Sequence, residues 1–182
     1  MDLVIPFLVA VAGAAVLTPV AMWLARRLGA VANPRSDRWS KRPTPTLGGI
    51  AIYLSYTATL ISFVPLTSEI IGLLVAGGAV FLLGLADDLR PLRPSVKLSG
   101  QVAAACLIIP LGIHAIFTMS PAVTIAATLL WIVAITNAFN LLDNMDGLSA
   151  GIAFLSSCFM CLVPVKLGDP GVSSAAAILA GA

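Results

Sequence analysis

The amino-acid sequence predicts an all-α polytopic membrane protein, a bundle of about six complete transmembrane helices followed by the start of a seventh. Hydrophobic residues make up 59% of the 182 residues and charged residues only 10%, whereas soluble domains carry about 25% charged residues. The charged residues also fall into short groups that separate long uncharged stretches. Because a helix needs roughly 20 apolar residues to cross a bilayer, these stretches predict an integral membrane protein.

The uncharged stretches give the expected spans in chain order. Those bounded by charged residues or polar loops are residues 3–25, 47–66, 70–86 and 147–165. A run without Asp, Glu, Lys or Arg over residues 98–142 is long enough for two spans. The turn between these two is predicted by Pro110, Gly112, His114 and Ser120-Pro121.

Residues 171–182 begin a further apolar segment, which reaches only about 18 Å at 1.5 Å per residue. The chain is therefore expected to be the N-terminal part of a longer protein. Residues 1–182 are expected to form a single transmembrane domain within it.

The basic residues predict the orientation in the membrane. Nine of the ten Lys and Arg residues fall in alternate loops, and Lys166 alone falls on the other side. The nine are Arg26, Arg27, Arg35, Arg38, Lys41, Arg42, Arg90, Arg93 and Lys97. By the positive-inside rule these loops are cytoplasmic and the N-terminus is outside. The loop that holds Asp143 and Asp146 falls on the same cytoplasmic side. The net charge of +2 reflects this topology and not binding to nucleic acid.

The first polar patch on the cytoplasmic side is the loop NPRSDRWSKRPTPTLGG, residues 33–49. Pro43 and Pro45 stiffen its backbone, and Gly48-Gly49 opens the next span, a combination suited to close approach of backbone to a ligand. Its lysine and arginine side chains are suited to holding phosphate oxygens. The alternative is a simple positive-inside anchor, which explains the charge but not Thr-Pro-Thr followed by Gly-Gly.

The second polar patch is GLADDLRPLRPSVK, residues 84–97, in which Asp87-Asp88 ends a span of 17 uncharged residues. Ionisable groups at the membrane interface or just inside it are costly and usually functional. The adjacent carboxylates repel each other, and a bound divalent cation would relieve this repulsion; oxygen ligands suit Mg²⁺. The alternative is a simple stop signal with an aspartate paired to Arg90 or Arg93.

The third polar patch is NAFNLLDNMDG, in which oxygen-bearing side chains recur every three residues at Asn137, Asn140, Asp143 and Asp146. In a straight helix these four side chains cannot all point one way. A helix that ends near Asn144, with Gly147 releasing the chain, would let Asp143 and Asp146 converge on one cavity. The alternative is that the asparagines hydrogen-bond to neighbouring helices.

The three patches together combine bases, metal-binding oxygens and phosphate-holding cations on one face of a membrane. This combination favours phosphoryl transfer between a soluble nucleotide and a lipid, with Mg²⁺ neutralising the diphosphate. Two rival enzyme classes fail on spacing. A prenyl synthase would need an acid where Pro91 stands, and a CDP-alcohol phosphotransferase would need further acids after Gly147. A transporter or channel subunit stays open as the rival from another class, although its ionisable residues should lie near mid-membrane.

The order PTPTLGG, ADD and NAFNLLDNMDGL, within residues 33 to 151, resembles the polyprenyl-phosphate N-acetylhexosamine-1-phosphate transferases of glycosyltransferase family 4. These integral membrane enzymes start the assembly of peptidoglycan, teichoic acid, O-antigen and enterobacterial common antigen. The resemblance implies transfer of a sugar 1-phosphate from a UDP-sugar to undecaprenyl phosphate, with release of UMP. It also implies an active site at the cytoplasmic face of the bacterial inner membrane and Mg²⁺, or alternatively Mn²⁺, as cofactor. Arg42-Pro43-Thr44 and the third patch look more like the N-acetylglucosamine branch than the phospho-N-acetylmuramoyl-pentapeptide branch.

The resemblance also implies roles for individual residues. Lys41 and Thr46 match loop residues near the substrate phosphates, and Asp87 and Asp88 match a pair that binds Mg²⁺ or deprotonates the lipid phosphate. Asn140 matches an asparagine close to the metal, and Asn137 is expected to join it in binding substrate. Asp143 and Asp146 match the acidic pair of the nucleotide and catalytic region.

Two departures from the family pattern are evident. Asn144 stands where the family often has glycine. The family has about ten spans, with a further metal-binding Asp and a His-containing loop in its C-terminal half, so residues 1–182 alone are expected to be inactive. The expected partners are a UDP-N-acetylhexosamine, undecaprenyl phosphate, membrane lipid and a second copy in a homodimer, with no nucleic acid.

Overall fold

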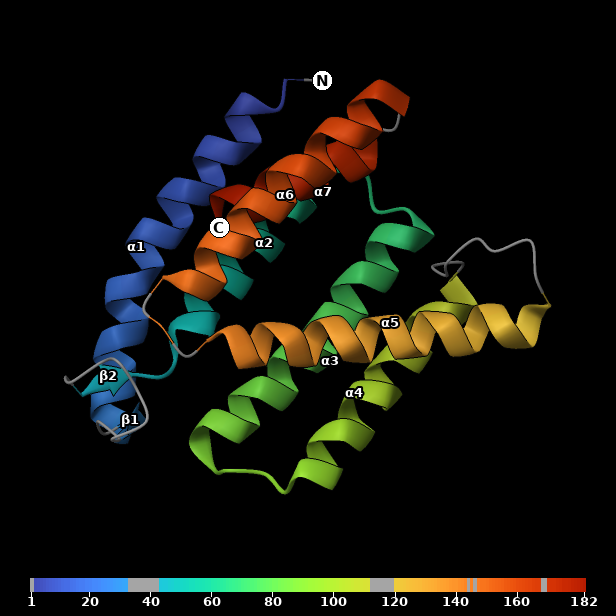
Figure 1. Ribbon diagram of the computed structural model, residues 1–182. Coiled ribbons are helices and arrows are strands. Elements are labelled where there is room, and N and C mark those ends of the chain that lie inside the picture. Colours follow the sequence, from blue (N-terminus) through green and yellow to red (C-terminus); the bar gives the residue numbers. More distant parts are fainter. Residues whose placement is uncertain (1, 33–42, 112–119, 144, 146, 168–169) are drawn as a thin grey trace. The chain divides into compact units, whose positions relative to one another are not determined.

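The computed structural model describes residues 2–32, 43–111, 120–143, 145, 147–167 and 170–182, and it consists almost entirely of helices (Figure 1). The helices are α1 (Val4–Leu28), α2 (Gly48–Phe63), α3 (Ser68–Leu89), α4 (Pro94–Ile108) with the 3₁₀ turn η1 (Ile109–Leu111), α5 (Pro121–Leu142), α6 (Leu148–Leu167) and α7 (Pro170–Gly181). The chain divides into two compact units, Met1–Pro65 with Asp143–Ala182, and Leu66–Leu142. The expectation of a single transmembrane domain stays a prediction.

Four of the helices in the described part of the chain are long and apolar enough to cross a membrane, namely α1, α3, α4 with η1, and α5. The apolar part of α6 and the whole of α2 and α7 are shorter. The all-α membrane fold is therefore confirmed in its helical character, and the count of six complete spans stays a prediction. Large apolar side chains stay exposed on these helices; Leu130 and Trp131 of α5, for example, are 72% and 68% exposed.

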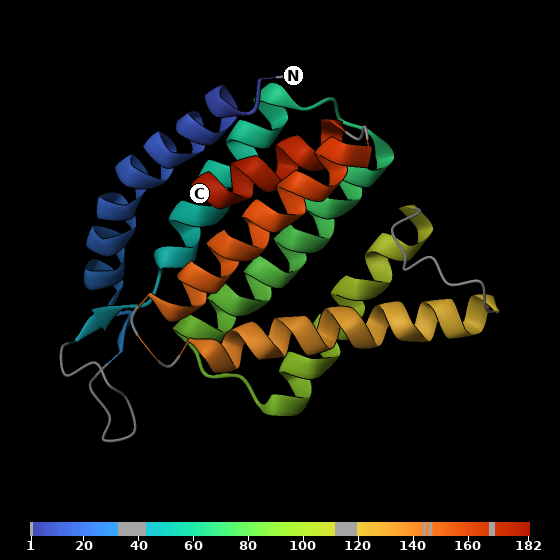
Figure 2. The ribbon, with the colours of Figure 1, turned by 45° about the horizontal axis from the view of Figure 1, so that its top comes forward.

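The first unit is built around α7, which contacts α1, α2 and α6 (Figure 2). Residues Ser173 to Ile178 of α7 are all buried. Most of these side chains are small, and small side chains allow membrane helices to approach closely. The stretch at residues 171–182, expected as the start of a further span, is thus a helix at the centre of this unit.

The contact between α1 and α2 depends on a glycine. The Ser55 hydroxyl on α2 donates a hydrogen bond to the carbonyl oxygen of Ala10 on α1 at 2.7 Å, and Ser55 is buried. A Cβ atom added at Gly13, one turn further along α1, would lie 2.6 Å from the Ser55 Oγ. Only glycine leaves the hydroxyl in this position.

We therefore expect Gly13→Ala to destabilise the protein by about 1–3 kcal/mol, because the new methyl group displaces the Ser55 hydroxyl from the Ala10 carbonyl. Thermal unfolding in detergent measures the effect as a lowered Tm. Gly77→Ala in α3 is the matched control, since it makes the same change within a helix where a Cβ would meet nothing within 4 Å. Equal Tm values for the two variants would contradict the predicted close contact.

A short antiparallel ladder departs from the all-α expectation. β1 (Val31–Ala32) pairs with β2 (Thr44–Pro45), with Val31 opposite Pro45 and Ala32 opposite Thr44. Gly29 ends α1 in the left-handed conformation, with φ of +69°, which releases the chain from the helix. Proline and the residue before it favour extended backbone, so the PTPT segment supplies the second strand.

The second unit contains α3, α4 and α5, and α4 contacts both of the others. α4 begins at Pro94, four residues before the expected start at Leu98. Pro94 is the first helical residue, where a missing N–H costs nothing and the fixed φ favours the helix. The predicted turn between the two spans is consistent with η1, which contains Pro110, and with the start of α5 at Pro121. Gly112 and His114 lie outside the described residues.

Candidate functional site

Asp87 and Asp88 lie in the last turn of α3, which ends at Leu89. Arg90 follows in extended conformation, with φ of −147° and ψ of 111°. Asp87 is half-buried and Asp88 is exposed. These two carboxylates therefore end an apolar helix that is long enough to cross a membrane, and its crossing of the membrane stays a prediction.

Two contacts hold the Asp87 carboxylate. Its Oδ2 accepts from the Lys97 ammonium at 2.8 Å, and its Oδ1 accepts from the backbone N–H of Leu92 at 2.8 Å. The two side chains of the ion pair are only 25% and 22% exposed, Asp87 and Lys97 respectively. With both oxygens engaged, the carboxylate has a fixed orientation at the end of α3.

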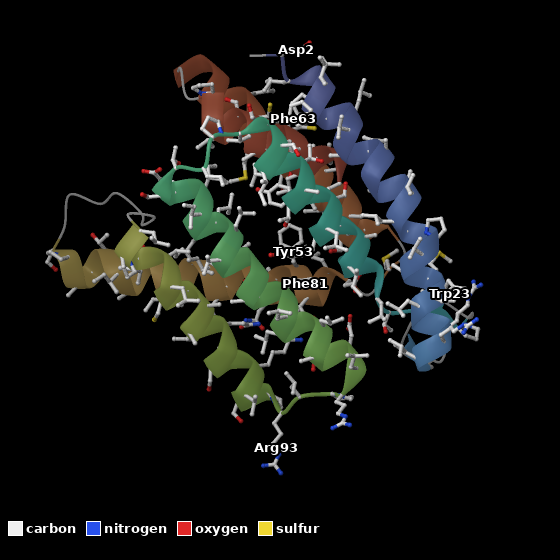
Figure 3. All side chains as sticks on the ribbon, turned by 180° about the vertical axis from the view of Figure 1, so that it is seen from behind. Asp2, Trp23, Tyr53, Phe63, Phe81 and Arg93 are labelled. Atoms are coloured by element: carbon white, nitrogen blue, oxygen red, sulfur yellow. The ribbon has the colours of Figure 1, made fainter. Side chains whose placement is uncertain are left out.

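The cation that pairs with Asp87 differs from the one expected under the stop-signal alternative. That alternative named Arg90 or Arg93, whereas the structure pairs Asp87 with Lys97. The reason is geometric: Lys97 lies in the first turn of α4, which packs back against α3. Figure 3 shows the Arg93 side chain pointing away from these helices.

A second polar contact joins α4 to α5. The Asn137 Nδ2 group donates to Gln101 Oε1 at 2.7 Å and to the Val133 carbonyl oxygen at 2.8 Å. Gln101 is only 2% exposed, while Asn137 is half-buried and Asn140 is exposed. Asn137 therefore makes the contact between helices that was the alternative to a substrate site. Both of its amide hydrogens are used, and its role in binding substrate stays a prediction.

Lys97 and Gln101 are the site residues that sequence reasoning missed. Lys97 falls within the second patch and among the cytoplasmic basic residues, but the sequence gives it no individual role, and Gln101 is not singled out. Their spacing of four residues places them on one face of α4, in a segment that is otherwise mostly apolar. This spacing was the available signal. Through these two side chains, α4 contacts Asp87 of α3 and Asn137 of α5.

The remaining candidate residues lie elsewhere. Thr46 is half-buried beside the β1–β2 ladder, and both its backbone N–H and its hydroxyl donate to the Ala30 carbonyl oxygen at 3.0 Å. This contact closes the base of the loop of the first patch. The role of Thr46 near substrate phosphates stays a prediction, and Lys41 lies outside the described residues.

The predicted turn of the third patch is confirmed at its two ends. α5 stops at Leu142, and Gly147 has φ of +78° immediately before α6 begins. Asp143 is exposed. Asn144 and Asp146 lie outside the described residues, so the expected convergence of Asp143 and Asp146 stays a prediction.

The second unit carries carboxylate and amide oxygens of the kind that bind Mg²⁺ together with a substrate. Mg²⁺ is usually held by one or two carboxylates together with substrate phosphates and water. Asp87, Asp88 and Asn140 supply donors of this kind. Within the described residues no three His, Cys, Asp or Glu side chains gather into a metal cluster. Joint binding of a divalent cation by Asp87, Asp88 and Asn140 stays a prediction.

Comparison with known proteins places the chain in a family. The model of the family described as glycosyl transferase family 4 matches residues 70–182. A Bacillus subtilis protein, described as a probable undecaprenyl-phosphate N-acetylglucosaminyl 1-phosphate transferase, is 29% identical over 91% of this chain and 49% of its own length. A decaprenyl-phosphate N-acetylglucosaminephosphotransferase of Mycobacterium tuberculosis is 34% identical over 82% of this chain and 42% of its own length.

A further relative represents the other branch. The phospho-N-acetylmuramoyl-pentapeptide-transferase of Carboxydothermus hydrogenoformans is 29% identical over 98% of this chain and 64% of its own length. The chain thus spans about half the length of the curated N-acetylglucosamine-type relatives. The family match includes Asp87, Asp88 and the third patch. The chain belongs to glycosyl transferase family 4.

Proposed function

We propose that the intact protein transfers a sugar 1-phosphate, in the first instance N-acetylglucosamine 1-phosphate, from a UDP-sugar to undecaprenyl phosphate, releasing UMP. The observation that carries this proposal is the likeness to the Bacillus subtilis relative over 91% of the chain. The chemistry of the second unit supports it, since oxygen donors at a helix end are suited to a metal ion shared with phosphates.

The proposed roles follow from what each side chain contacts. Asp87, oriented by Lys97 and the Leu92 N–H, together with Asp88 and Asn140 would hold Mg²⁺, or Mn²⁺ in its place. When bound, the metal would stabilise the negative charge that develops on the transferring diphosphate. Asp87 and Asp88 are also the candidates for removing the proton of the lipid phosphate. Asp143 and Asp146 are proposed for the nucleotide and catalytic region, and Lys41 and Thr46 for the substrate phosphates.

We also propose a bacterial inner-membrane location with the site facing the cytoplasm. The positive-inside distribution of Lys and Arg supports this orientation. A second feature is found near the end of α1, where the Arg27 guanidinium lies over the Trp23 ring at 4.5 Å from its centre (Figure 3). Tryptophan is enriched at membrane–water interfaces, and the arginine beside it suits the cytoplasmic one. A homodimer stays a prediction.

An assay of the full-length protein in detergent tests the proposed function. With Mg²⁺, undecaprenyl phosphate and labelled UDP-N-acetylglucosamine, we expect a lipid-linked sugar pyrophosphate and equimolar UMP. A parallel reaction with UDP-N-acetylmuramoyl-pentapeptide tests the other branch, and turnover of that donor alone would reassign the substrate.

Proteoliposomes test the rival from another class. Uptake of a UDP-sugar into proteoliposomes without release of UMP would favour a transporter and contradict the transferase proposal.

Chelation by EDTA should abolish product formation, with recovery on adding Mg²⁺ or Mn²⁺. Product formation that persists at full rate in EDTA would remove the metal from the proposal.

A further inference from the structure

α5 has few buried side chains in this structure. Thr128 is its one buried residue among the 22 of the helix. Figures 1 and 2 both show α5 running across α4 rather than along it. Helices that cross at a large angle touch over a short stretch. The position of α5 against α4 therefore depends on the few contacts made where they cross.

A hydrogen bond from Asn137 to Gln101 joins α5 to α4. Its length is 2.7 Å, and Gln101 is 2% exposed. An amide buried in an apolar helix without a partner is costly, so each of these two side chains favours the arrangement that satisfies the other. The second hydrogen of the Asn137 amide is held by the Val133 carbonyl oxygen of its own helix, which fixes the direction of the side chain.

The same face of α4 also holds the end of α3. Lys97 lies four residues before Gln101, about 6 Å along the helix at 1.5 Å per residue, and pairs with Asp87. Asn140 lies three residues after Asn137, about one turn further along α5. One face of α4 thus connects the helix end that carries the two aspartates to the helix turn that carries Asn140.

We propose that Gln101 is a positioning residue, which through its hydrogen bond to Asn137 holds Asn140 of α5 at the place where it shares a cation with Asp87 and Asp88. This inference rests on the proposed function, since it assumes that these three residues bind a divalent cation. Gln101 itself touches neither cation nor substrate. It acts through Asn137 alone.

The test uses the full-length protein in detergent and measures the half-saturating Mg²⁺ concentration in two ways. One is the rise in Tm as Mg²⁺ is added without substrate, and the other is the Mg²⁺ dependence of turnover. For Gln101→Leu we expect this concentration to rise about tenfold in both, because partners that orient metal ligands typically contribute 10- to 100-fold. The KM for the UDP-sugar at saturating Mg²⁺ should stay within about twofold, because Gln101 does not touch it.

Two further variants separate positioning from general packing. Thr136→Val, next to Asn137, removes a hydroxyl that donates to the Ile132 carbonyl oxygen of its own helix at 2.8 Å. This variant should keep the wild-type half-saturating Mg²⁺ concentration. Gln101→Asn shortens the link and should raise the half-saturating concentration. Adding Asn137→Gln restores the combined length of the two side chains and should return the value to within about threefold of wild type.

A wild-type half-saturating Mg²⁺ concentration in Gln101→Leu would overturn the proposal, even if the metal-free Tm falls. If Gln101→Leu fails to fold, a wild-type half-saturating Mg²⁺ concentration in Gln101→Asn would overturn the proposal instead. Failure of the proposed function is distinguishable, because Asp88→Asn would then also leave Mg²⁺ binding unchanged. If Asp88→Asn weakens Mg²⁺ binding and the Gln101 variants do not, only the positioning role is wrong.

Discussion

Asp88→Asn in the full-length protein is expected to lower kcat by about 10²- to 10³-fold. The substitution keeps the size of the side chain and removes its negative charge at the end of α3. In its proposed roles the carboxylate binds the metal or removes the proton of the lipid phosphate, and proton transfer by a positioned side chain typically contributes about 10²- to 10⁴-fold in rate. Turnover of labelled UDP-N-acetylglucosamine at saturating lipid and Mg²⁺ measures the effect.

The control for Asp88→Asn lies on the same helix. Glu69→Gln makes the same change from carboxylate to amide in the first turn of α3, at the end remote from the site, and should retain wild-type kcat.

Asp143→Asn tests the third patch in the same assay and should also lower activity strongly. Full activity in Asp88→Asn and Asp143→Asn would remove the basis for both assignments.

The helix ends could be predicted from sequence because they carry local signals. Asp87-Asp88 marks the end of α3, Pro121 is the first residue of α5, and Gly147 precedes α6 with positive φ. Each signal acts within a few residues of the backbone that it shapes. The ladder between β1 and β2 escaped prediction because each strand has only two residues, too few for an alternating pattern to be visible.

The partners of the site residues could be predicted only in part. The stop-signal alternative pairs an aspartate with Arg90 or Arg93, whereas the described partner of Asp87 is Lys97, because α4 folds back against α3. Hydrogen bonding of an asparagine to a neighbouring helix was foreseen as an alternative. The identity of its partner, Gln101, was not, because a contact across 36 residues depends on which faces of α4 and α5 meet. The sequence therefore indicates which residues belong to a site better than it indicates which of their side chains contact each other.

Lys97→Met is expected to lower kcat by about 10- to 100-fold, the typical effect of removing a group that orients a metal ligand. Methionine keeps most of the length of the side chain and removes the ammonium that holds Asp87 Oδ2 at 2.8 Å. The Asp87 carboxylate would then be held only by the Leu92 N–H and would be left half-buried without its cation. Steady-state turnover of the full-length protein and its Tm in detergent measure the two consequences.

Matched variants distinguish this pairing from a general loss of positive charge. Arg93→Met removes a cation only four residues away whose side chain points away from the helices (Figure 3), and should keep kcat within about twofold. Lys97→Arg retains the charge and should recover part of the activity. A similar loss in Arg93→Met and Lys97→Met would show that surface charge, not the ion pair, matters.

A double-mutant cycle then tests whether Lys97 acts through Asp87. If it does, adding Lys97→Met to Asp87→Asn should cost much less than adding it to the wild-type protein, because the charge that the lysine holds is already gone. Residues in one ion pair show such non-additivity, whereas independent residues contribute additively within about 0.3–0.5 kcal/mol. Additive losses in kcat would mean that Lys97 acts independently of Asp87, and the ion pair at the end of α3 would then lose its proposed role in orienting the aspartate.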